Sequence, residues 1–299
     1  MRSIRTIAVP LGLAILAASS TTLAADKPEP AKVSTALPGV SLLADQLEMP
    51  GLNRKRQIRM YLPPGYAGSG KRYPVLYMHD GQNLFDTATA YAGEWKVDET
   101  LDALAKEGKL ELIVVGIDNG QDKRMTELNA WTNPRFGAAE GKEYTDFVVK
   151  TLKPLIDKTY RTLPDRANTA IMGSSMGGLA SHYALVQYPQ VFSKAGVFSP
   201  AYWTAQPSFD FVARKPVPKD ARVFLLMGEK EGPEMVDDVK RMADVVRKSG
   251  HPAANTVLKI VPGAEHNEKF WAGELREALL WMFTTGDTKV ASGKVAKSK

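Results

Sequence analysis

The stretch Asn168-Thr-Ala-Ile-Met-Gly-Ser-Ser-Met-Gly-Gly-Leu-Ala-Ser-His-Tyr-Ala184 sets the expectations for the rest of the chain. Residues 170–172 form an apolar run typical of a buried strand, and residues 179–186 have the composition of a helix. The segment Gly173-Ser174-Ser175-Met176-Gly177 between them must turn sharply. Glycine lets the two backbones approach closely, and a strained junction of this G-x-S-x-G type lifts the central serine hydroxyl above the edge of a sheet. We therefore expect Ser175 to be a nucleophile.

Strand-like and helix-like runs alternate along the chain. Strands are expected at residues 40–47, 54–62, 73–78, 110–117, 168–172, 193–198, 222–227 and 256–261, and helices at residues 97–107, 143–160, 179–186, 233–249 and 268–283. The first two strands are expected to be antiparallel at a sheet edge. The later alternation predicts the α/β class, with a mostly parallel central sheet of about eight strands and helices on both faces. Ser175 would follow about the fifth strand.

The N-terminus has the pattern of a secretory signal peptide. Arg2 and Arg5 precede an apolar stretch, and Thr22-Leu23-Ala24 ends the segment with a small residue. It is too short for a membrane anchor, and no later apolar run of about 18 residues follows. We expect a periplasmic or secreted protein without an integral membrane segment after cleavage. Its expected organisation is a signal peptide at 1–24, a flexible lead-in at 25–38, one domain at 39–286 and a flexible basic tail at 287–299.

Composition excludes several classes of protein. The 299 residues include no cysteine, which rules out a thiolate nucleophile, a disulfide framework and cysteine-based metal sites. Loss of Arg2 and Arg5 with the signal peptide lowers the formal charge from +6 to +4, and this excess is not clustered. Nucleic-acid binding is therefore not expected. We expect neither a cofactor nor a metal, and the oligomeric state stays open.

A serine hydroxyl needs a base, and the chain has four histidines. His182 lies seven residues beyond Ser175 on the same expected helix, about 10 Å along its axis, which is out of hydrogen-bond reach. His251 lies in a polar turn and is expected in solvent, and His79 precedes the serine in the chain. His266 follows the last expected strand, at the sheet edge where sites of such folds gather. The order serine, acid, histidine makes His266 the expected base.

The acid and the oxyanion hole follow from the same architecture. Glu229 and Glu231 both follow the last but one expected strand, and either could orient the imidazole and stabilise its cation. One oxyanion donor is the backbone N–H of Met176, directly after the nucleophile, and the second comes from an earlier loop. Because Gly81 permits an unusual backbone conformation there, the N–H of Gln82 is the expected second donor.

Several motifs resemble an esterase family of α/β-hydrolases that includes enterochelin-esterase-like proteins, feruloyl and acetylxylan esterases, and mycolyltransferases. The resemblance covers residues 54–283. It rests on Tyr73-Pro-Val-Leu-Tyr-Met-His-Asp-Gly-Gln-Asn-Leu-Phe-Asp86, Glu94-Trp95-Lys-Val-Asp98, Gly173-Ser-Ser-Met-Gly-Gly178, Phe198-Ser-Pro-Ala-Tyr-Trp203 and His266-Asn-Glu-Lys-Phe-Trp271.

This resemblance implies an α/β-hydrolase fold with Ser175 as nucleophile, His266 as base and Glu231, three residues past Gly228, as acid. It also implies that the backbone amides of Gln82 and Met176 form the oxyanion hole. Feruloyl-type relatives often have aspartate where this chain has Glu231. Similar residues in relatives suggest that Trp203 faces the substrate, with plain core packing as the alternative.

The expected function is an exported serine esterase that hydrolyses a small-molecule or carbohydrate ester through an acyl-enzyme. Residues 204–219 are too few for a large helical lid, which disfavours long acyl chains. A siderophore lactone and a feruloyl or acetyl carbohydrate ester are the candidate substrates, and the mild positive charge slightly favours the anionic siderophore. An acyltransferase of the same fold and a non-catalytic binding protein are the alternatives.

Overall fold

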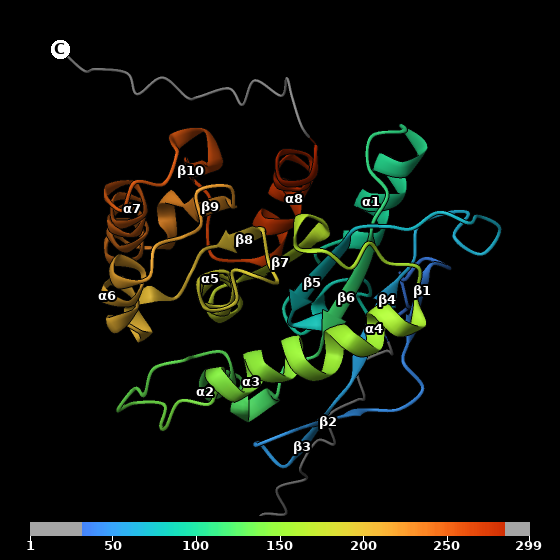
Figure 1. Ribbon diagram of the computed structural model, residues 1–299, viewed down its shortest axis with the longest axis horizontal. Coiled ribbons are helices and arrows are strands. Elements are labelled where there is room, and N and C mark those ends of the chain that lie inside the picture. The colour runs from blue at the N-terminus through green and yellow to red at the C-terminus, as the bar shows by residue number, and fades with distance from the viewer. Residues whose placement is uncertain (1–31, 285–299) are drawn as a thin grey trace, which may run out of the picture. The chain divides into compact units, whose positions relative to one another are not determined.

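The computed structural model describes residues 32–284, and the expected signal peptide and basic tail lie outside this range. Its centre is an eight-stranded sheet with the order β1-β4-β6-β5-β7-β8-β9-β10 (Figure 1). These strands are β1 (Val40–Leu42), β4 (Ile58–Tyr61), β5 (Val75–His79), β6 (Ile113–Ile117), β7 (Thr169–Ser174), β8 (Lys194–Phe198), β9 (Arg222–Gly228) and β10 (Thr256–Val261).

The sheet is parallel except at one edge. β1 pairs antiparallel with β4, and β4 pairs antiparallel with β6, whereas the remaining neighbours are parallel. Along the chain, β7 is the fifth strand of this sheet and lies inside it, between β5 and β8. Every residue of β5, β6 and β7 is buried, as expected for strands covered on both faces. The predicted mostly parallel α/β architecture is confirmed.

The first expected strands are shorter than predicted. The chain leaves the sheet after β1 and forms a separate two-stranded ladder of β2 (Leu47–Met49) and β3 (Arg54–Arg56) before β4 begins. The turn between β2 and β3 contains positive φ angles at Gly51 (86°) and Asn53 (50°). Such a tight turn pairs its flanking residues with each other and so interrupts the sheet edge.

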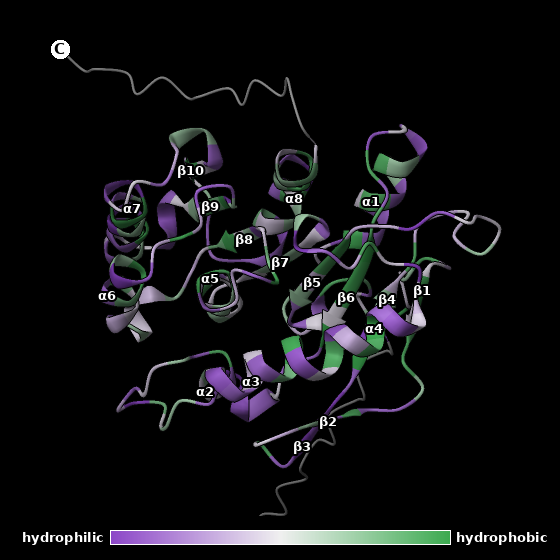
Figure 2. Ribbon diagram, viewed as in Figure 1, coloured by the Kyte–Doolittle hydropathy of each residue, from purple (hydrophilic) through white to green (hydrophobic). Residues whose placement is uncertain are grey.

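Helices cover both faces of the sheet (Figure 1). They are α1 (Val97–Lys106), α2 (Arg124–Glu127), α3 (Gly141–Phe147), α4 (Lys153–Thr159), α5 (Met176–Gln187), α6 (Pro207–Arg214), α7 (Pro233–Lys248) and α8 (Glu268–Phe283). α1 and α8 bury apolar residues in one cluster, and α3 to α7 do so in a second cluster across the sheet. Figure 2 shows the matching pattern, with hydrophobic central strands and helices of mixed hydropathy.

The expected helix 143–160 contains a wider turn. α3 and α4 are joined by a π-helical turn, Val148–Leu152, which ends two residues before Pro154. Proline lacks an N–H group and clashes with the carbonyl of the fourth residue before it, and a π turn is one way to relieve that conflict without ending the helix.

The described part of the expected lead-in is anchored to the domain. The Thr35 N–H donates to Asp86 Oδ1 at 3.1 Å, and the Leu37 N–H donates to Asp98 Oδ2 at 2.9 Å. Residues 32–38 therefore lie against the segment that leads into α1. Within residues 32–284, no helix combines the length and apolarity needed to cross a membrane.

Candidate active site

Ser175 lies in the sharp turn between β7 and α5. Its backbone has φ 57° and ψ −119°, a conformation that residues with a side chain rarely adopt. The Ser175 N–H donates to the Phe198 carbonyl at 2.9 Å, which holds the turn against β8. A Cβ added at Gly173 would lie 2.8 Å from the backbone of Gly177, so only glycine allows this approach. The predicted strand-turn-helix junction is confirmed, and the Ser175 side chain is accessible whereas Ser174 is buried.

His266 lies in the loop between β10 and α8 and contacts a buried glutamate. Its Nδ1 is 2.6 Å from Glu231 Oε2, and the Glu231 side chain has no exposed surface. The second oxygen, Oε1, accepts from the Ser199 hydroxyl at 2.6 Å and from the Gly228 N–H at 2.8 Å. A carboxylate with this many donors is fixed in position and can hold one imidazole tautomer.

The structure distinguishes Glu229 from Glu231, between which the sequence could not choose the acid. Both belong to the 3-10 turn Glu229–Glu231 after β9. Glu229 is exposed, and its Oε2 accepts from the Gly263 N–H at 3.0 Å instead of contacting His266. This hydrogen bond ties Glu229 to the loop that carries His266, whereas Glu231 contacts the imidazole itself.

Ser199 and Trp271 extend this hydrogen-bond chain, a role that the sequence did not predict for either residue. The Trp271 Nε1–H donates to Ser199 Oγ at 2.8 Å, and Ser199 in turn donates to Glu231. The Trp271 ring also meets the His266 ring edge to face, with centroids 4.9 Å apart. Both residues lie in motifs that carried the family resemblance, and this was the one signal in the sequence that could have pointed to them. Their contacts could not be predicted because they join segments that are distant in sequence.

Ser175 and His266 line a common pocket of about 810 Å³, together with Gln82 and Trp271. No hydrogen bond joins Ser175 and His266 in the described structure, and the Nε2 of His266 has no partner among the described residues. In proteins without bound substrate such contacts are often long and tighten only in the complex. The pocket therefore brings an accessible hydroxyl and a carboxylate-oriented imidazole to the same space.

Gln82 is held from two sides in the 3-10 turn Gly81–Asn83 after β5. Its carbonyl accepts from Thr89 Oγ1 at 2.7 Å, and its side-chain Oε1 accepts from the Asn119 N–H at 3.0 Å. The hydrogen bonds that close the turn do not use the Gln82 N–H. Met176 begins α5, so its N–H has no acceptor within the helix. Both expected oxyanion donors are thus backbone amides without a role in the secondary structure.

A partly buried ion pair lies directly before this turn. Arg124 donates to both oxygens of Asp80, at 2.5 Å from Nε and 2.9 Å from Nη2, and the Asn119 side chain adds a bond of 2.7 Å. Burial acts to raise the pKa of Asp80, but the charge and hydrogen bonds of Arg124 outweigh it and lower that pKa. Arg124 was not among the predicted residues, although it follows β6 at the edge of the sheet where the site lies.

The other three histidines lie outside the pocket lining. His79 contacts the Tyr144 hydroxyl and His182 contacts the Tyr202 hydroxyl, each at 2.7 Å, and burial lowers the pKa of each imidazole to about 4. The expectation that His251 lies in solvent was wrong. It is buried because the turn folds back onto the start of β9, and its Nε2 contacts the carbonyl of the preceding residue, Ala221, at 3.1 Å.

Trp203, the expected substrate-facing residue, does not line the pocket. It is 41% exposed and packs edge to face on Phe136, with ring centroids 5.9 Å apart. The aromatic residues of the pocket are instead Trp271, which is buried, and Tyr91, which is 90% exposed at its surface.

The chain is similar to known esterases in sequence and in fold. The family model described as "Putative esterase" matches residues 50–282. The Bacillus subtilis (strain 168) protein named "Uncharacterized protein YbbA" is 27% identical over 242 residues, which are 76% of this chain and 92% of that protein.

Two solved structures show the same fold. A ferulic acid esterase aligns with a TM-score of 0.63 at 22% identity, over 82% of this chain and 98% of that one. An enterobactin esterase from Shigella flexneri, solved in the presence of enterobactin, aligns with a TM-score of 0.67 at 18% identity, over 83% of this chain and 60% of that one. Since the family model matches well over half of its residues, the chain belongs to the esterase family of α/β-hydrolases and is a carboxylic-ester hydrolase.

Proposed function

We propose that the chain is an exported serine esterase in which Ser175 is the nucleophile, His266 the base and Glu231 the acid. The observation that carries this proposal is the 2.6 Å contact between His266 Nδ1 and the buried Glu231, in a pocket that Ser175 also lines. An acid-oriented imidazole beside an accessible hydroxyl is the arrangement that activates a serine for attack on an ester.

In the proposed acylation step, Ser175 Oγ attacks the ester carbonyl carbon while His266 Nε2 takes its proton. The oxyanion that forms accepts hydrogen bonds from the Gln82 and Met176 amides. The imidazolium, stabilised by ionised Glu231, then gives its proton to the departing alcohol and leaves an acyl-enzyme. Water activated by His266 attacks this intermediate and releases the acid, so that Ser175 regains its proton.

The pocket favours a compact, largely uncharged ester. Its lining has two basic side chains, Lys32 and Arg124, and three acidic ones, Asp80, Asp122 and Glu268. Burial raises the pKa of Glu268. The overall positive charge of the chain is not repeated at the site, which removes the advantage expected for an anionic siderophore. We therefore propose a feruloyl or acetyl carbohydrate ester as the substrate class, as the name of the ferulic acid esterase also suggests.

Acyl length is the first test of this substrate class. Residues 204–219 contain only the eight-residue α6, and none of them lines the pocket. Aryl acetates and butyrates should therefore exceed aryl octanoates in kcat/KM by about tenfold, and methyl ferulate should exceed a catecholate lactone. A clear preference for octanoate would show that the pocket binds long acyl chains. Faster cleavage of the lactone would make a siderophore lactone the favoured substrate class instead.

Tyr91 provides a matched test of the pocket. Tyr91→Ala should raise KM for a feruloyl ester by about three- to tenfold through loss of aromatic contact, with little change for an acetyl ester. Trp203→Ala removes another exposed aromatic residue outside the pocket lining and should leave both values unchanged. An effect of Trp203→Ala that equals or exceeds that of Tyr91→Ala would place the acyl or alcohol group near Trp203 instead.

Export has its own test. The basic start, the apolar stretch and Thr22-Leu23-Ala24 favour cleavage after Ala24. When the chain is expressed in a Gram-negative host with its own N-terminus, the product in the periplasm or medium should have the intact mass of a protein that begins at Ala25. Full-length protein confined to the cytosol would contradict export.

A further inference from the structure

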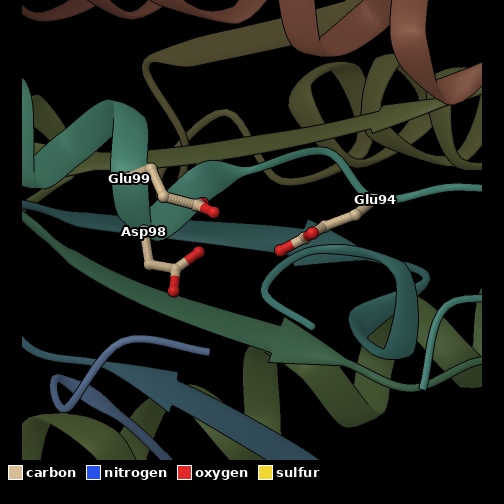
Figure 3. Close-up of side chains that lie close together, drawn as sticks. All are labelled: Glu94, Asp98 and Glu99. Carbon is tan, nitrogen blue, oxygen red and sulfur yellow. The ribbon is translucent and has the colours of Figure 1, made fainter. Parts of the chain in front are cut away.

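Three carboxylates converge beside the start of α1, outside the proposed catalytic site. Glu94, Asp98 and Glu99 point toward a shared space (Figure 3). One oxygen atom from each residue lies within 4.8 Å of the other two. Glu94 comes from the segment that leads into α1, and the other two residues belong to its first turn.

One oxygen atom of each of these carboxylates has no hydrogen-bond partner in the described part of the chain. Glu94 Oε1, Asp98 Oδ1 and Glu99 Oε2 are all buried and unpaired among the described residues. Asp98 has no exposed surface, and Glu94 is only 8% exposed. Buried acceptors of this kind are rarely left without a donor or a cation in native proteins. The unpaired oxygens therefore require either a donor or a cation.

The other oxygen of each of the two most buried residues, Glu94 and Asp98, accepts hydrogen bonds. Glu94 Oε2 accepts from Thr87 Oγ1 at 2.7 Å and from Thr35 Oγ1 at 3.0 Å. Asp98 Oδ2 accepts from the Leu37 N–H at 2.9 Å. These bonds fix the orientation of both carboxylates and leave the other oxygen of each residue free.

No basic side chain compensates the three charges. In residues 32–284, neither lysine nor arginine forms an ion pair with any of the three carboxylates. The first turn of α1 favours acidic side chains electrostatically, but that effect supplies no partner for the buried oxygens. Three like charges can stay ionised together in such a site only when a cation neutralises them.

We propose that Glu94, Asp98 and Glu99 bind a hard divalent cation, Ca²⁺. All three ligand atoms are carboxylate oxygens, the type that Ca²⁺ prefers, and no nitrogen or sulfur ligand is present in the group. Calcium–oxygen distances of about 2.3–2.6 Å allow ligands on opposite sides of the ion to be about 4.6–5.2 Å apart, which accommodates the observed separations.

Bound Ca²⁺ would stabilise the turn that presents the Gln82 amide. The Trp95 N–H donates to the Asn83 carbonyl at 2.8 Å, and the Val97 N–H donates to the Leu84 carbonyl at 3.0 Å. These bonds tie the cluster's segment to the residues directly after Gln82. The cation would act as a structural ion, and its binding does not depend on the proposed triad.

Calcium titration of the purified chain after EDTA treatment tests the site. Saturating CaCl₂ should raise Tm by about 5 °C or more, because a ligand that binds only the folded state stabilises it. Tb³⁺, which replaces Ca²⁺ at oxygen sites, should show luminescence excited through the adjacent Trp95. Asp98→Asn and Glu99→Gln should each abolish both signals. Asp237→Asn, which removes an exposed charge from α7, should keep both.

Measurements on the metal-free protein distinguish a metal-binding role of Asp98 from a purely structural one. Asn at position 98 can still accept from Leu37 and can donate to a neighbouring carboxylate, so Asp98→Asn in EDTA should have a Tm equal to or above that of the parent. The competing state is a shared proton, since burial and the nearby Glu99 raise the pKa of Asp98 to about 7. Absence of both the Tm shift and the terbium signal would establish that state and overturn the proposal.

Discussion

Ser175→Ala is expected to lower kcat/KM for ester hydrolysis by about 10⁴-fold or more while Tm stays within about 2 °C of the parent value. The loss is large because Ser175 is partly exposed at the turn, whereas the neighbouring Ser174, which also lines the pocket, is only 5% exposed. The fold should tolerate the change because the Ser175 N–H, which bonds Phe198, remains. Initial rates with an aryl acetate and a thermal melt measure the two effects.

Ser174 provides the neighbouring control. It is buried at the end of β7, so Ser174→Ala should retain at least about a tenth of the activity. A serine-reactive phosphonate should add its mass to the peptide at Ser175 and not at Ser174. Labelling of Ser174, or an undiminished rate in Ser175→Ala, would remove Ser175 from the mechanism.

The elbow could be predicted from the sequence because its determinants are local. An apolar strand, crowded glycines and a helix start lie within 17 consecutive residues, and the backbone at Ser175 follows from them. The sheet class was predictable for a similar reason, since alternating strands and helices leave few topologies. The expected edge strands were less accurate because the β2–β3 turn redirects the chain.

Contacts between distant segments could not be predicted. Ser199 is 32 positions from Glu231 and 72 from Trp271, and no periodicity links them. His251 was expected in solvent because its neighbours are polar, but its burial depends on a return to β9. The choice between Glu229 and Glu231 depended on the direction of a single 3-10 turn, which the spacing of two glutamates does not define.

Glu231→Gln is expected to lower kcat by about 10³- to 10⁴-fold. The glutamine carbonyl can keep the bonds from Ser199 and Gly228, so its amide NH₂ would face His266. That NH₂ would donate to Nδ1 and so place the imidazole proton on Nε2, where it blocks removal of the Ser175 proton. A neutral amide also cannot stabilise the imidazolium.

Glu229→Gln is the matched control for charge and position. Its oxygen can still accept from the Gly263 N–H, so kcat should stay within about threefold of the parent value. Both variants should be compared at saturating substrate, with Tm recorded to exclude unfolding. A larger loss in Glu229→Gln than in Glu231→Gln would move the acid to Glu229, whereas activity close to the parent in both would mean that Ser175 and His266 work as a pair. The proposed triad requires a larger loss of kcat in Glu231→Gln than in Glu229→Gln, because only Glu231 contacts the imidazole.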